Sequence, residues 1–140
     1  MSKRKLFISK NLNIPEDKML VIADFIVFCS ESLPTSGDVC VKIVDNREKY
    51  GIKTTALYSI GENYICVYAK GRSLADVLRS VAHEMTHMLQ DQKGMITGPV
   101  RDAGGFHEDH ANAKAGELIK LYAKLPGRRA IYENLSKNII

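Results

Sequence analysis

The order of hydrophobic and polar positions predicts a strand, a helix and a second strand in the first third of the chain. Residues 5–9 have the composition of a short strand, and a helix is expected to follow as far as about Ser32. Pro15 and the acidic residues after it are typical of a helix N-terminus. Val39, Val41 and Ile43 alternate with polar or small residues, which is the period of a half-buried strand.

A β-hairpin is predicted next, from two runs rich in β-branched and aromatic residues at 54–60 and 64–69. The runs are joined by Gly61-Glu62-Asn63, a short polar connection that suits a tight reversal of the chain. Together with the two earlier strands, this hairpin would complete a small sheet.

Helical segments are expected in the rest of the chain. The first begins after Ser73, whose hydroxyl can cap the backbone N–H of Asp76, and it ends near Gly94. Its apolar positions recur at helical spacing: Leu74, Val77, Leu78, Val81, Met85, Met88 and Leu89. Residues 95–106 are expected to form a loop, with further helices at 107–125 and 128–136. These elements indicate an α+β fold in which a small twisted sheet packs on helices.

Length and composition favour one domain that spans residues 1–140. A hydrophobic content of 45% is sufficient for a single core without disulfides. Cys29, Cys40 and Cys66 lie in separate apolar runs, so we expect buried free thiols and a cytoplasmic location. A formal net charge of +4 does not by itself imply nucleic-acid binding, and no apolar run is long enough to span a membrane. The oligomeric state stays open.

The sequence His83-Glu84-Met85-Thr86-His87 is an HExxH motif within the predicted helix at 73–93. Positions four apart on a helix lie about 40° from each other around its axis, so both imidazoles can reach one metal ion. Glu84 projects from the flank of the same face. A zinc ion can lower the pKa of a bound water to about 7, and Glu84 is then expected to take the proton as the catalytic base.

A zinc ion in a catalytic site needs a third protein ligand, for which the segment after the loop offers several candidates. His107, Glu108 and His110 all lie there, so the four histidines of the chain fall in two neighbouring segments. On a helix, Glu108 and Asn112 share a face with Ala111 and Ala115, small residues that would allow close approach to the HExxH helix.

HExxH followed after 20 intervening residues by ExxANxxA resembles the gluzincin metallopeptidases, in particular compact ones of the ImmA/IrrE type. The resemblance covers roughly residues 54–125. It implies a zincin-like fold, one zinc ion held by His83, His87 and Glu108, and Asn112 as a supporting group behind a ligand histidine. Peptide-bond hydrolysis, with a peptide or protein as substrate, is the implied reaction.

The resemblance also implies that the strand before the HExxH helix borders the cleft and pairs with extended peptide substrate. The residues in that place are Tyr64, Ile65, Cys66, Val67 and Tyr68. From the residues alone, this run is a buried strand, and the two roles can coexist on alternate faces.

The sequence leaves two questions open: which residue stabilises the oxyanion, and whether a rival function applies. The residue that stabilises the oxyanion is unassigned, with four candidates: His107, His110, Tyr122 and Tyr132. Two rival functions are a zincin-like binding domain that keeps its metal without turnover, and a SprT-like protease with an all-histidine site. In the second rival, His107 or His110 would replace Glu108 as the third ligand.

Overall fold

Four strands and three helices make up the part of the chain that the structure, a computed structural model, describes: residues 4–96 and 106–126. Their order is β1 (Leu6–Lys10), α1 (Glu16–Ser32), β2 (Val39–Val44), β3 (Ala56–Ser59), β4 (Tyr64–Tyr68), α2 (Leu74–Gln92) and α3 (Phe106–Ala123). The predicted α+β class is confirmed. The helix expected at 128–136 lies outside the described residues, as does most of the loop expected at 95–106. None of the described helices combines the length and apolar character needed to cross a membrane.

The strands form one mixed sheet in the order β1-β2-β4-β3. Strands β1, β2 and β4 are parallel, with Ile8 beside Val41 and Val41 beside Ile65. Strand β3 runs antiparallel to β4 as the predicted hairpin. The turn between them needs left-handed backbone at Gly61 (φ 80°) and Asn63 (φ 49°), two residue types that tolerate that conformation.

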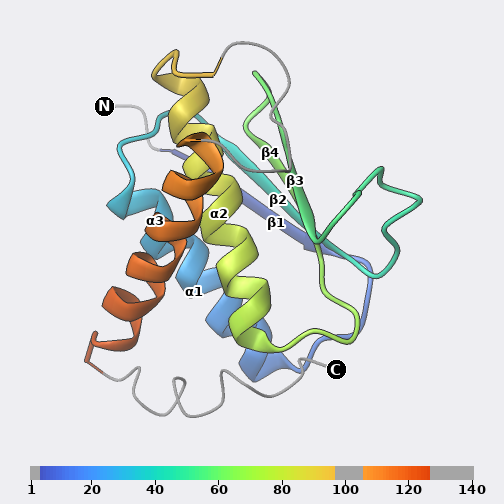
Figure 1. Ribbon diagram of the computed structural model, residues 1–140. Helices are drawn as coiled ribbons and strands as arrows, with labels where there is room; N and C mark the ends of the chain where they lie inside the picture. The colour runs from blue at the N-terminus through green and yellow to red at the C-terminus, as the bar shows by residue number, and fades with distance from the viewer. Residues whose placement is uncertain (1–3, 97–105, 127–140) are drawn as a thin grey trace.

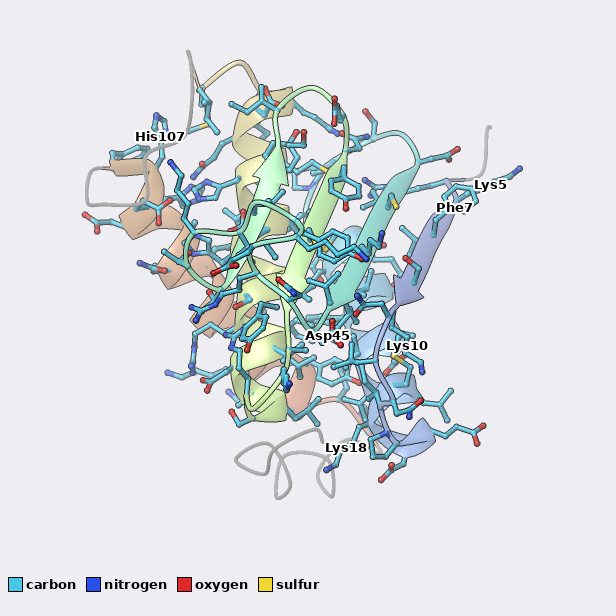
Figure 2. The ribbon with its side chains drawn as sticks, turned by 90° about the vertical axis from the view of Figure 1, so that its right-hand side faces the viewer. Lys5, Phe7, Lys10, Lys18, Asp45 and His107 are labelled. Carbon is cyan, nitrogen blue, oxygen red and sulfur yellow. The ribbon has the colours of Figure 1, made fainter. Side chains whose placement is uncertain are left out.

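The three helices lie on one face of the sheet, and α2 runs between the sheet and α3 (Figure 1). The main core fills this space, where Val39, Val41 and Ile43 of β2 point toward the helices and are at most 1% exposed. The predicted alternation of β2 is therefore confirmed. Figure 2 looks onto the opposite face, where Phe7 of β1 is 54% exposed. A smaller cluster of Val44, Ile52 and Cys66 is buried on that side.

The cysteines are free, as expected, but they are not equally buried. Cys29 and Cys66 are buried, and burial raises the pKa of both thiols. Cys40 is only partly buried, because it alternates with the inward-facing residues of β2 and so points to the outer face of the sheet. The expectation of a buried thiol is therefore wrong for Cys40.

Helix α2 begins and ends with specific polar contacts. At its start the Ser73 hydroxyl accepts a hydrogen bond from the Asp76 N–H at 3.1 Å, as the sequence predicts. Near its end, the Asp91 carboxylate accepts hydrogen bonds from the Tyr58 hydroxyl (2.6 Å) and the Gly61 N–H (2.8 Å). The next residue, Gln92, bonds Ser36 and Asn63 through its side chain. The helix that carries the HExxH motif is thus fixed to the β3–β4 hairpin and to the segment before β2.

Candidate metal centre

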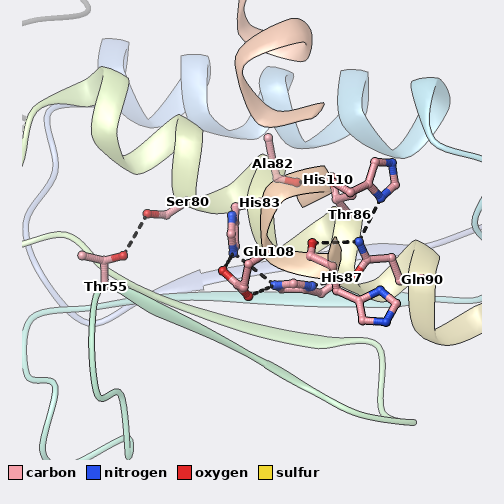
Figure 3. A network of polar contacts seen from close by, with 10 residues as sticks. Thr55, Ser80, Ala82, His83, Thr86, His87, Gln90, Glu108 and His110 are labelled. Carbon is pink, nitrogen blue, oxygen red and sulfur yellow. Dashed lines mark hydrogen bonds and ion pairs between the residues drawn. The ribbon is translucent and has the colours of Figure 1, made fainter. Parts of the chain in front are cut away.

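Three side chains of the predicted ligand set converge in the space between α2 and α3. His83 and His87 lie on successive turns of α2, and Glu108 lies in the first turn of α3 (Figure 3). Glu108 Oε1 is 2.7 Å from His87 Nε2, and Glu108 Oε2 is 3.2 Å from His83 Nε2. The two Nε2 atoms are 3.1 Å apart. One ligand atom from each residue lies within 4.8 Å of the others, so the group could hold a metal ion.

Close packing of α3 on α2 brings Glu108 to the two histidines. Ala111 and Ala115 face α2 with no exposed surface, so their small side chains allow the helix backbones to approach. Asn112 lines the same cavity as Glu108 and His83. The expected face of Ala111, Asn112 and Ala115 therefore lies toward the HExxH helix.

The surroundings of His83 favour the neutral form of its imidazole, which is the form that binds a metal. Burial is the main cause that lowers its pKa below the ordinary value, and the nearby His87 lowers it further. The Glu108 carboxylate and the Asn112 side chain act in the opposite direction without reversing the shift. The neutral form of the ring keeps a lone pair for a metal.

Glu84 lies outside the ligand group but beside it. Only 8% of its surface is exposed, and it lines two cavities that border the ligand group, one of about 290 Å³ and the other of about 440 Å³. Both cavities also reach Glu108. Glu84 therefore lies where a molecule bound at the ligand group would meet it.

Gln90, which the sequence reasoning did not single out, is the central polar residue behind the ligands. It has no exposed surface, and its Oε1 lies 2.8 Å from His87 Nδ1. Its Nε2 donates to the His107 carbonyl oxygen at 3.0 Å and lies 2.9 Å from His110 Nδ1. The available signal was spacing, since residues three apart on a helix are neighbours and Gln90 follows His87 by three.

The candidates for the oxyanion role are placed away from the ligand group where the structure describes them. His107 and His110 are not members of the ligand group, and His110 lies on the far side of Gln90 from His87 (Figure 3). Tyr122 is fourteen residues after Glu108, about 21 Å further along α3. Its hydroxyl donates to Asp24 Oδ2 at 2.8 Å, and its ring packs against Phe25. Tyr132 lies outside the described residues.

Replacement of Tyr122 tests whether this residue contributes to folding stability or to the metal centre. Because its hydroxyl hydrogen-bonds a carboxylate in a partly buried place, Tyr122→Phe should lower the free energy of unfolding by about 1–3 kcal/mol. Metal affinity should not change. Chemical denaturation and a metal titration of the same variant measure the two effects, and a weakened metal site would contradict the placement.

The strand expected to pair with substrate is corrected by the sheet topology. Strand β4 is hydrogen-bonded to β2 on one side and to β3 on the other, so its backbone groups are already used. The residues concerned are Tyr64, Ile65, Cys66, Val67 and Tyr68. The outermost strand on this side of the described sheet is β3, whose residues 56–59 line the 440 Å³ cavity together with Glu84, His87 and Glu108. The strand at this edge of the described sheet is therefore β3 rather than β4.

Comparison with known proteins adds no assignment. No protein-family model matches the chain, and no curated protein matches it in sequence. The chemistry that the site can perform is therefore argued from its own residues. Two imidazoles and one carboxylate lie around a common point, and Glu84 adds a second carboxylate on the flank.

Proposed function

We propose that the protein is a zinc-dependent metallopeptidase of the gluzincin kind, with a zincin-like fold. The observation that carries the proposal is the convergence of His83, His87 and Glu108 from two helices, with Glu84 beside them in the cleft. Catalytic zinc sites characteristically have three protein ligands and leave a position open for water or substrate. The set of two histidines and one glutamate fits this pattern.

In the proposed mechanism, His83, His87 and Glu108 would hold the zinc ion. When bound, the ion supplies Lewis acidity that polarises the scissile carbonyl and makes water a nucleophile at neutral pH. The Glu84 carboxylate accepts the proton of the attacking water as the new C–O bond forms. It then gives that proton to the leaving amine as the C–N bond breaks, so the glutamate ends in its starting state.

The two cavities beside the ligands support an extended substrate that crosses the site. One is polar, lined by residues that include Thr55, Arg72 and Ser80, whereas the other is bordered by Leu57, Tyr58 and Ile60 of the hairpin. Backbone groups at the β3 edge are positioned to pair with a peptide strand. The proposed substrate is an unfolded or extended segment of a peptide or protein, polar on one side of the cleaved bond and apolar on the other.

The two rival functions have less support in the residues. A binding domain that holds its metal without turnover would have no use for a nearly buried carboxylate at Glu84, beside the ligands rather than among them. A SprT-like site would need His107 or His110 as a ligand, but neither is part of the group of His83, His87 and Glu108. The His110 ring lies against Gln90 instead, with Nδ1 2.9 Å from Gln90 Nε2.

A cleavage assay tests the proposed function directly. The purified protein, loaded with one equivalent of zinc, is incubated with a library of unstructured peptides, and the products are identified by mass spectrometry. We expect cleavage that stops when the metal is removed by a chelator and returns when zinc is added back. A loaded protein that cleaves no member of the library, while metal analysis shows full occupancy, would favour the binding-domain rival.

A further inference from the structure

Gln90 is a buried amide that contacts both helices of the candidate metal centre. It belongs to α2, three residues after His87, and has no exposed surface. The oxygen and the nitrogen of its amide face different elements. Oε1 faces His87 on the same helix, and Nε2 faces the start of α3. A fully buried amide with partners at both ends is held in a single orientation.

The orientation of this amide follows from one unambiguous partner. The His107 carbonyl oxygen can only accept a hydrogen bond, so the group 3.0 Å from it must be the Gln90 NH₂. The Oε1 atom then faces His87 Nδ1 at 2.8 Å, and an amide oxygen can only accept. His87 Nδ1 must therefore carry a proton. With Nδ1 engaged by Gln90, Nε2 is the nitrogen of this ring that is left to bind a metal, and it is the atom that faces Glu108.

From these contacts we infer that Gln90 is a positioning residue that fixes His87 in its metal-binding tautomer and sets the place of Glu108. Gln90 sets the place of Glu108 through the backbone, because the carbonyl that it binds belongs to His107, the residue before Glu108. One side chain thus orients a ligand on α2 and anchors the turn of α3 that supplies another ligand. The inference depends on the metal centre of the proposed function but not on turnover.

The remaining contact of Gln90 agrees with the same orientation. The second hydrogen of its NH₂ group is directed at His110 Nδ1, 2.9 Å away, which makes that nitrogen the acceptor. His110 is itself stacked on Phe106, with the two ring planes 16° apart. His110 therefore completes the environment of the amide from the α3 side.

The test compares Gln90→Met with Gln92→Met. Both changes replace an amide by an apolar chain of similar length near the end of α2. Among the described residues the Gln92 side chain bonds Ser36 and Asn63, which are not ligands. We expect zinc affinity, measured by competition with a chromogenic chelator, to fall about 10–100-fold in Gln90→Met and to be unchanged in Gln92→Met. Equal affinities in the two variants, or an equal loss in both, would overturn the inference.

A second measurement reads the tautomer without metal. Long-range ¹H–¹⁵N spectra of the metal-free wild type should show a proton on His87 Nδ1, and the spectra of Gln90→Met should show that this proton is partly lost. Gln90→Glu, which keeps an acceptor for His87 but no donor for His107, should retain the wild-type tautomer and still lose zinc affinity. A metal-free wild type without a proton on His87 Nδ1 would refute the inference, whether or not the variants fold and whether or not the protein cleaves peptides.

Discussion

Glu84→Gln should reduce peptide cleavage by about 10²- to 10⁴-fold while leaving zinc affinity unchanged. The loss is expected because the amide cannot take a proton from the attacking water. The metal should be retained because Glu84 is not part of the group formed by His83, His87 and Glu108. Initial rates on a cleaved peptide, together with a zinc titration of the same preparation, separate the two effects.

Glu62→Gln is a suitable control for this change. Glu62 is an exposed glutamate in the β3–β4 turn whose carboxylate binds Ser59 Oγ at 2.7 Å, away from the ligand group. The control should cleave at the wild-type rate. If Glu84→Gln retains full activity, then Glu84 is not the base and the proposed mechanism is wrong.

Glu108→Ala should weaken zinc binding by more than about 100-fold, which exceeds the usual effect of losing a supporting group behind a ligand. Glu108 supplies both oxygen contacts to the histidine pair, and its loss leaves only two ligands on α2. A chelator competition assay measures the change, and circular dichroism of the metal-free variant shows whether α3 still forms.

Two matched variants show whether the effect belongs to this carboxylate. Glu117→Ala removes an exposed glutamate of the same helix, whose carboxylate pairs with Lys114, and zinc affinity should be unchanged. His110→Ala should cause only a small loss because His110 contacts Gln90 rather than the ligand group. A large loss in His110→Ala with a small loss in Glu108→Ala would support the all-histidine rival instead.

The elements and the motif could be predicted because their signals are local in the sequence. The cap of α2 depends on Ser73 and Asp76, three residues apart, and the strand period of β2 is visible in six residues. HExxH acts through one helix, so its geometry follows from helix dimensions alone. Glu108 as the third member of the group was implied by the family resemblance, and the small residues Ala111 and Ala115 indicated the close helix contact that brings it there.

Features that depend on long-range pairing could not be predicted in this way. Strand β4 was expected at the edge of the cleft, but the parallel pairing of β2 with β4 makes β4 internal and leaves β3 outermost. A hairpin sequence does not show which of its strands will find a further partner. Gln90 was missed for a similar reason, since its importance depends on a backbone carbonyl of α3 seventeen residues away.

The last turn of α2 also holds the hairpin that borders the 440 Å³ cavity, through a contact that depends on the protonation of Tyr58. Asp91, one residue after Gln90, holds the hairpin through Tyr58 and Gly61, so the ligands and the opposite wall of the cleft are attached to the same helical turn. Burial, with a further contribution from Asp91, raises the pKa of Tyr58 above its ordinary value. This hydroxyl therefore stays protonated, and remains a donor, well into the alkaline range. The contact between the hairpin and α2 should therefore persist at alkaline pH. A change in the cleavage rate at alkaline pH would then reflect Glu84 and the three ligand residues rather than a movement of the hairpin.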